Sequence, residues 1–329
     1  MKTKTHILKI EFLRAIAAFS VLIFHFTCSP YGNKTLAKTE GLRHFFEYGA
    51  QGVELFYIIS GFVISYALSI QKYEFLHYPK FLLKRIFRII PPYIFTIVCI
   101  LSFSFYLNHF LWGTPFNLDF KKIFINLFYL ADLFPNVEWI NPIFATLKVE
   151  FQFYVLIGLL FPFIHKYKWF LVLSLITFIT IGLYAPIGDT VFRNSPFFFS
   201  GILIFYITKK ENLAFYYSLF VFVLCVLFIK YALQDFVVVI LGSALLLFLP
   251  ANFSVFKISG KISYSIYLTH GLVGGWFIYF ISQNSFFEGQ PILTFILAFV
   301  FSWCFAWLAF QLIEKPSIKL SKMIKYRKK

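Results

Sequence analysis

The chain has 329 residues, of which 60% are apolar and 13% charged, and its mean hydropathy is +0.78. A soluble domain carries about a quarter charged residues, so this composition excludes a soluble enzyme, a disordered chain and a secreted disulfide scaffold. The net charge of +16 would suggest a nucleic-acid partner in a soluble protein, but in a chain this apolar it indicates basic segments that face the cytoplasm. We therefore expect an all-α, polytopic membrane helix bundle that is surrounded by membrane lipid and binds no nucleic acid.

Long apolar stretches recur along the whole chain. A membrane-spanning helix needs about 20 mostly apolar residues. The first stretch contains Glu11 and Arg14 and has no convincing cleavage site, so it is predicted to be a retained span rather than a signal peptide. The apolar segment Ile123–Phe134 is too short to cross and is predicted to be interfacial or re-entrant. In all we expect about ten transmembrane helices, near residues 8–28, 49–70, 89–111, 143–164, 169–186, 195–208, 214–230, 236–250, 262–281 and 292–313.

The basic residues indicate how these spans are oriented. With the N-terminus inside, most of the 30 Lys and Arg residues fall in cytoplasmic segments, above all in Lys72–Arg88 and in the basic tail 314–329. This bias predicts that both termini are cytoplasmic, which requires an even number of spans. Pro316 and the basic tail are predicted to end the last helix at the inner face. No loop is long enough for a separate domain, so we expect one transmembrane domain over residues 1–329 with no fused soluble domain.

Two polar residues interrupt the first span. A charge inside the bilayer is costly unless it faces a cavity or a partner, which makes it a candidate functional residue. Arg14 and His25 are eleven residues apart, about three helical turns or roughly 16 Å, so they share a helix face. The alternative is structural: an arginine whose head group reaches the interface, and a histidine that caps the outer end of the helix.

The second span carries one carboxylate, Glu54, a turn or two inside its outer end. His25 is predicted at a similar depth on the antiparallel neighbour, where a carboxylate would orient the imidazole and raise its basicity, as a general base requires. Alternatively, Glu54 is an interfacial residue of the outer face. Ser60 and Gly61 follow in the same span, and close helix packing alone would explain these small residues.

A cationic patch precedes the predicted third span. Arg85 and Arg88 are three residues apart and share a helix face just inside the cytoplasmic boundary. Together with Lys80 and Lys84 they form the kind of patch that binds phosphates. The alternative is ordinary anchoring of a helix end by basic residues on the cytoplasmic side.

Two later spans also contain polar clusters. Lys148 and Glu150 lie inside the fourth span, where they are either functional or part of an ion-pair network that fixes packing. In the ninth span Tyr264 and Tyr267 share a face that His270 continues. The structural alternative for His270 is a core histidine that is hydrogen-bonded to a neighbouring carbonyl.

These segments together resemble the acyltransferase-3 family of integral-membrane O-acyltransferases. Six blocks carry the resemblance, in the family's order and over almost the whole chain: Arg14-x10-His25, Gly52–Phe62, Arg85-x-x-Arg88, Glu150–Tyr154, Ser263–His270 and Glu314–Pro316. The chain departs from the family pattern at Glu54, where the family often has Asp, and at Phe151, where it often has a second Glu.

The resemblance implies an O-acyltransferase, in the usual case an O-acetyltransferase, of a bacterial inner membrane. The donor would be cytoplasmic acyl-CoA, usually acetyl-CoA, and the acceptor a hydroxyl of a cell-surface polysaccharide or glycolipid such as lipopolysaccharide. Arg14, Arg85 and Arg88 would bind CoA. His25 would be a general base or a covalent acyl carrier, with Glu54 or Glu150 orienting it or binding the acceptor. Candidate supporting residues, some of them as oxyanion donors, are Ser60, Lys148, Tyr264, Tyr267 and His270.

Two further expectations concern metals and an alternative function. The four cysteines lie far apart and form no metal-ligand pattern, so no metal site is expected. The same intramembrane charges would also suit a transporter that exports an organic acid or a glycan without acyl transfer. The sequence shows no clear repeat of one half in the other, which many transporters have.

Overall fold

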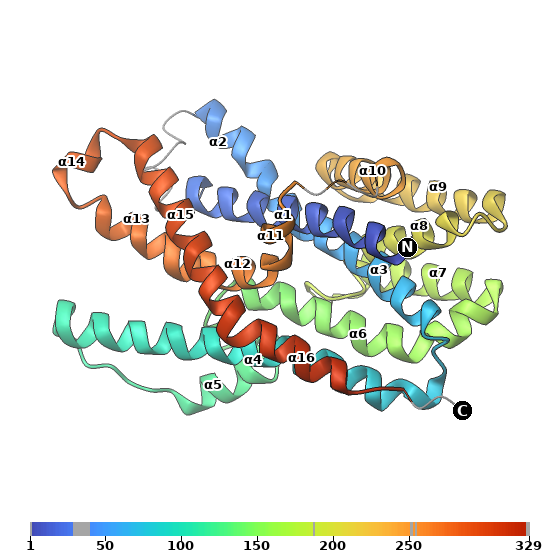
Figure 1. Cartoon of the computed structure of the whole chain (residues 1–329), viewed down its shortest axis with the longest axis horizontal. Coiled ribbons are helices and arrows are strands. Elements are labelled where there is room, and N and C mark those ends of the chain that lie inside the picture. Colours follow the sequence, from blue (N-terminus) through green and yellow to red (C-terminus); the bar gives the residue numbers. More distant parts are fainter. Residues whose placement is uncertain (1, 29–39, 187, 251–252, 254, 327–329) are drawn as a thin grey trace.

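The structure is a computed structural model of the chain, and it describes residues 2–28, 40–186, 188–250, 253 and 255–326. In these residues all regular secondary structure is helical, as the sequence predicts (Figure 1). Six segments are long and apolar enough to cross a membrane: Leu8–Cys28, Gly41–Ile70, Phe75–Trp112, Ile143–Lys166, Leu213–Lys230 and Pro291–Met323. The prediction of an all-α polytopic membrane protein is therefore confirmed.

The helices follow one another along the chain with short connections. The α-helices are α1 Lys2–Cys28, α2 Glu40–Glu47, α3 Gly52–Ile70, α4 Tyr78–Tyr106, α5 Phe120–Leu127, α6 Ile143–Lys166, α7 Lys168–Tyr184, α8 Ser195–Thr208, α9 Leu213–Lys230, α10 Leu233–Phe248, α11 Lys257–Lys261, α12 Ser263–His270, α13 Trp276–Ile281, α14 Ser285–Glu288, α15 Pro291–Ala309 and α16 Lys315–Met323. Short 3-10 turns occupy Tyr48–Gln51, Phe75–His77 and Ala131–Leu133, and π-helical turns occupy Leu107–Trp112, Gly271–Gly275 and Phe310–Glu314.

Four of the predicted spans correspond to helical segments outside those six. Three are the shorter apolar helices α7, α8 and α10, and the fourth is α12 joined to α13 through the π-helical turn. The predicted segment 123–134 contains only the short helix α5 and a 3-10 turn, too little to cross. In Figure 1 α1 begins and α16 ends toward the same end of the bundle. The count of ten spans and the cytoplasmic side of both termini stay predictions.

Two helices continue through prolines. Helix α4 begins at Tyr78, before the predicted span near residues 89–111, and runs through Pro91 and Pro92, so Arg85 and Arg88 lie on one helix as expected. Pro91 and Pro92 have no N–H for the carbonyls of Phe87 and Arg88, a loss that membrane helices tolerate. Nearby on the same helix, the Ile89 carbonyl accepts a hydrogen bond from the Tyr264 hydroxyl at 3.1 Å.

The last helix also continues where the sequence predicts that it ends. The π-helical turn Phe310–Glu314 leads directly into α16, which contains Pro316 at its start. A proline ring normally meets the carbonyl four residues before it, and the wider π turn gives that ring room. The Ser317 hydroxyl donates to the Ile313 carbonyl at 2.7 Å and so binds one of the carbonyls of this turn.

Close helix packing brings α3 against α8. A Cβ atom on Gly61 would lie 2.1 Å from the carbonyl oxygen of Phe198, and one on Gly201 would lie 2.0 Å from that of Ile58. Only glycine allows this approach, which confirms that Gly61 serves helix packing. Because α3 is fixed on α8 at these points, its opposite face is presented to α1 and α6, where the cavity described next is found.

Candidate active site

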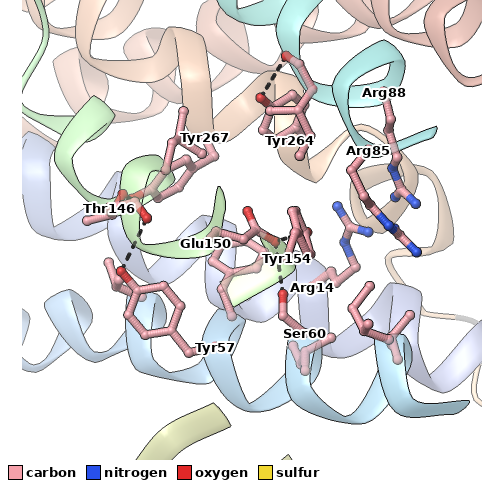
Figure 2. Close-up of a pocket in the computed structure, with 17 residues that line it drawn as sticks. Arg14, Tyr57, Ser60, Arg85, Arg88, Thr146, Glu150, Tyr154, Tyr264 and Tyr267 are labelled. Carbon is pink, nitrogen blue, oxygen red and sulfur yellow. Dashed lines mark hydrogen bonds between the residues drawn. The ribbon is translucent and has the colours of Figure 1, made fainter. Parts of the chain in front are cut away.

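A cavity lies among α1, α3, α4, α6 and α12, with about 810 Å³ of free space including its open mouth. Figure 2 shows two different ends: the guanidinium groups of Arg14, Arg85 and Arg88 gather on one side, and hydroxyl groups lie on the other. The polar residues that line the cavity are Arg14, Tyr57, Ser60, Arg85, Arg88, Thr146, Glu150, Tyr154, Tyr264 and Tyr267.

The carboxylate between these two ends is Glu150 of α6. The Ser60 hydroxyl donates to its Oε1 at 2.9 Å, and the Tyr154 hydroxyl, one helical turn along α6, donates to the same oxygen. No described group donates to Oε2, although the side chain lines the cavity. Glu150 is thus held in place through one oxygen and can accept a hydrogen bond from a ligand with the other.

Three arginines without carboxylate partners form the cationic end. Within the described residues none of them makes an ion pair. Arg14 Nε donates to the Ser263 hydroxyl at 3.1 Å. The Arg85 guanidinium lies 5.2 Å from the centroid of the Phe81 ring and 5.3 Å from that of Tyr154, a cation–π arrangement that orients it toward the cavity. Cations without direct ion-pair partners are costly in an apolar bundle, and an anionic ligand would reduce that cost.

The hydroxyl groups of the cavity are already engaged. The Thr146 hydroxyl donates to the Ile143 carbonyl at 2.7 Å, so in the hydrogen bond that it shares with Tyr267 the tyrosine is the donor. The Tyr264 hydroxyl donates to the Ile89 carbonyl, and the Ser60 hydroxyl to Glu150. The three candidate oxyanion donors therefore use their protons within the protein and serve in this arrangement to hold the cavity walls.

His25 and Glu54 do not line the cavity, and no hydrogen bond joins them in the described structure. The predicted pairing fails because of helix register. A Cβ atom on Gly52 would lie 2.4 Å from the carbonyl oxygen of Ala17, so Glu54 is level with the residues before Ala17. Along the antiparallel helices this places Glu54 roughly 15 Å from the level of His25, toward the start of α1.

The ring beside His25 belongs instead to His270 of α12, with the two ring centroids 5.0 Å apart. His270 is buried, and its Nδ1 lies 2.8 Å from the Tyr267 carbonyl and 3.1 Å from that of Ile266. This matches the expectation of a core histidine bound to a neighbouring carbonyl. It also makes His270 the connection between His25 and Tyr267, which lines the cavity.

Lys148 points away from Glu150, because residues two apart on a helix face different directions. Its ammonium forms an ion pair with Asp132 and donates to the Asp189 carbonyl. The Trp139 indole donates to the other oxygen of Asp132 at 2.7 Å. These contacts tie α6 to the segments on both sides of it, so the structure favours the predicted ion-pair network over a place in the cavity.

Glu314 has a similar role at α12. Its side chain is buried and accepts from the Ser265 hydroxyl at 2.6 Å and from the Ser265 backbone N–H at 3.2 Å. Ser263, two residues earlier, binds Arg14. One short segment of α12 therefore connects the π-helical turn that contains Glu314 with the cationic end of the cavity.

Three polar residues of the cavity lie outside the set predicted from the sequence. They are Tyr57, Thr146 and Tyr154. Each lies three or four residues from a predicted residue on the same helix, Tyr57 before Ser60 and the other two on either side of Glu150. Helical periodicity applied to the predicted residues would have found all three.

Comparison with known proteins identifies the family to which the chain belongs. The model of the acyltransferase-3 family, described as an acyltransferase domain, matches residues 7–311. Comparisons with curated proteins and with solved structures gave no match. The matched region covers nearly the whole chain and contains every residue that lines the cavity. The chain belongs to the acyltransferase-3 family and is accordingly a membrane acyltransferase.

Proposed function

We propose that this membrane acyltransferase is an O-acetyltransferase that uses cytoplasmic acetyl-CoA as its co-substrate. Its acceptor is a hydroxyl of a cell-surface polysaccharide or glycolipid such as lipopolysaccharide, and its location is a bacterial inner membrane. The observation that carries the proposal is the cationic end of the cavity, where Arg14, Arg85 and Arg88 gather and form no ion pair with any carboxylate that the structure describes.

The three arginines suit the phosphate groups of CoA. A planar guanidinium forms paired, charge-assisted hydrogen bonds with phosphate oxygens, which lysine cannot form in the same geometry. Arg85 and Arg88 lie on α4 and Arg14 on α1, so a bound phosphate would be held from two helices. The rest of the cavity then accommodates the pantetheine arm, with the thioester toward the end formed by Thr146 and Tyr267.

In the transfer step that we propose, His25 acts as the general base, although it lies outside the cavity: it lies beside His270, whose ring is next to the cavity residue Tyr267, so the acceptor would approach the thioester from that side. His25 takes the proton of the acceptor hydroxyl while the hydroxyl oxygen attacks the thioester carbonyl. The carbon–sulfur bond then breaks, and the CoA thiolate leaves and receives a proton. The alternative is that His25 first carries the acetyl group itself and passes it to the acceptor in a second step.

Of the two carboxylates, we assign the acceptor-binding role to Glu150. Glu150 lines the cavity, and no donor among the described residues reaches its Oε2. Glu54 lies outside the cavity, and its Oε2 is buried without a hydrogen-bond partner in the same part of the chain. Glu150 would accept hydrogen bonds from acceptor hydroxyls and so orient the one that reacts. Lys148 has an indirect role in this proposal, because its contacts with Asp132 and Asp189 hold α6 in place.

The donor side can be tested separately from the acceptor. Purified protein in lipid nanodiscs is titrated with acetyl-CoA and, in parallel, with pantetheine that bears an S-acetyl group but no phosphate. We expect acetyl-CoA to bind, the phosphate-free analogue to bind at least tenfold more weakly, and R85A/R88A to abolish the difference. Equal binding of both compounds would overturn the assignment of the arginines. If the protein bound a simple organic acid but neither of these two compounds, the result would favour the alternative function, a transporter that exports an organic acid.

A further inference from the structure

His270 presents one nitrogen with no partner. Carbonyl oxygens only accept hydrogen bonds, so the contacts from Nδ1 to the carbonyls of Tyr267 and Ile266 fix the hydrogen on Nδ1. The other nitrogen, Nε2, then carries a lone pair. It is buried and has no hydrogen-bond partner in the described structure, and the side chain as a whole is 0% exposed. A buried acceptor without a donor is unfavourable unless a donor reaches it during function.

His25 supplies the neighbouring donor. Its ring centroid lies 5.0 Å from that of His270 at an interplanar angle of 43°, and its ring forms no hydrogen bond in the described structure. Among the described residues the second ring packed on His25 is Phe24, with a centroid distance of 5.0 Å, and it offers no polar atom. The two imidazoles are thus in ring contact, so rotation of the His25 ring can direct an N–H toward Nε2 of His270.

The chain segment after His270 packs closely on α1 next to the two histidines. Directly after His270 the helix widens into the π-helical turn Gly271–Gly275, a feature that is often found at functional sites. A Cβ atom on Gly274 would lie 1.9 Å from Cζ of Phe26, the residue next to His25. A side chain at position 274 would collide with the Phe26 ring, so the glycine leaves room for that ring beside the π-helical turn.

We propose that His270 is a positioning residue for His25. Its Nε2 accepts a hydrogen bond from one N–H of His25 and thereby holds His25 in a single tautomer, with the other nitrogen unprotonated and available to the acceptor hydroxyl. When that nitrogen takes the hydroxyl proton, the N–H to His270 stays in place and stabilises the imidazolium. The role in transfer rests on the proposed function, but the pairing of the two rings does not.

The test of the pairing uses ¹⁵N NMR of histidine-labelled protein in lipid nanodiscs, with the His25 signals assigned from their loss in H25A. We expect one neutral tautomer of His25 in the wild type and in H270Q, whose amide oxygen can accept near the position of Nε2. In H270F and H270N we expect a mixture of tautomers. Asparagine keeps a donor near Nδ1 for the carbonyls but offers no acceptor at Nε2, so H270N separates positioning from folding. An unchanged His25 tautomer in H270N and H270F would overturn the proposal.

The second readout is acetyl transfer by the same proteins. We expect kcat to fall at least tenfold in H270F and H270N, with KM for acetyl-CoA unchanged, and to recover in H270Q. His165, whose Nδ1 lies 3.2 Å from the Tyr206 hydroxyl, provides the control: H165F leaves both His25 and kcat unchanged. If the wild type transfers no acetyl group, the proposed function fails while the tautomer result still decides the pairing. A tautomer that depends on His270 together with an unchanged kcat would overturn the positioning role.

Discussion

The Ser60 hydroxyl of α3 donates a hydrogen bond of 2.9 Å to Oε1 of Glu150 on α6, across the wall of the cavity. The contact joins residues 90 positions apart in the chain and fixes the direction of the carboxylate. A hydrogen bond to a charged group contributes about 1.5–3 kcal/mol. The position of Glu150 therefore depends on both helices.

The first prediction compares the two carboxylates. Glu150→Gln should lower the rate of acetyl transfer at least tenfold, because an amide binds acceptor hydroxyls without the negative charge. The matched change Glu54→Gln should leave the rate within about threefold of wild type. Both rates are measured with purified protein at saturating acetyl-CoA. A larger loss in E54Q than in E150Q would reverse the assignment.

The second prediction concerns the cationic end of the cavity. Arg85→Ala should raise KM for acetyl-CoA roughly ten- to hundredfold, since one charge-assisted contact contributes about 1.5–3 kcal/mol. Arg85→Lys should restore part of the affinity, because lysine keeps the charge but loses the planar pair of donors. Arg193 is exposed and outside the cavity, so Arg193→Ala is the control. An equal rise of KM in R193A would mean that the effect is general electrostatics.

The third prediction concerns the packing of α3 on α8. Gly201→Ala places a Cβ atom 2.0 Å from the Ile58 carbonyl oxygen, and we expect this overpacking to destabilise the protein by about 1–3 kcal/mol. Gly41 has open space around its would-be Cβ, so Gly41→Ala should have no such effect. The stability of both variants is measured by heating them in detergent and recording the fraction of protein that remains monodisperse. Equal melting temperatures of G201A and wild type would show that α3 and α8 can move apart without loss of stability, which contradicts the prediction.

The fourth prediction concerns the ion pair of Lys148. Its side chain is 7% exposed, whereas that of Asp132 is 45% exposed. Asp132→Asn leaves a buried ammonium with only the Asp189 carbonyl, so it should destabilise the protein by about 3 kcal/mol. Lys148→Met leaves a carboxylate that water can solvate and should cost less. Chemical unfolding of the two variants gives the order, and the opposite order would mean that Asp132 is the buried partner.

Much of the fold follows from hydropathy, because apolar stretches of about 20 residues are typical of membrane-spanning helices. Helix ends are harder, since Pro91 and Pro316 normally end helices and here do not. Before Pro316 a π turn widens the helix and gives the ring room, and the sequence pattern does not reveal that turn.

In the site, too, the residues that share one helix are predicted correctly and the contacts between helices are not. Spacing on one helix correctly places Arg85 with Arg88 and Tyr264 with Tyr267 on the cavity wall. It fails for His25 and Glu54, because their relative depth depends on the register between α1 and α3. That register is set where Gly52 meets Ala17, a contact that no pattern within either helix reveals.

Transfer itself can be followed with the natural acceptor. Surface glycan from cells that lack the gene is added to proteoliposomes that contain the purified protein and acetyl-CoA labelled in the acetyl group. We expect label on one glycan hydroxyl, located by nuclear magnetic resonance, with one CoA thiol released for each acetyl group transferred and with both signals lost in R85A/R88A. Unlabelled glycan and no release of CoA, from protein that binds acetyl-CoA, would overturn the proposal that this cavity performs acetyl transfer.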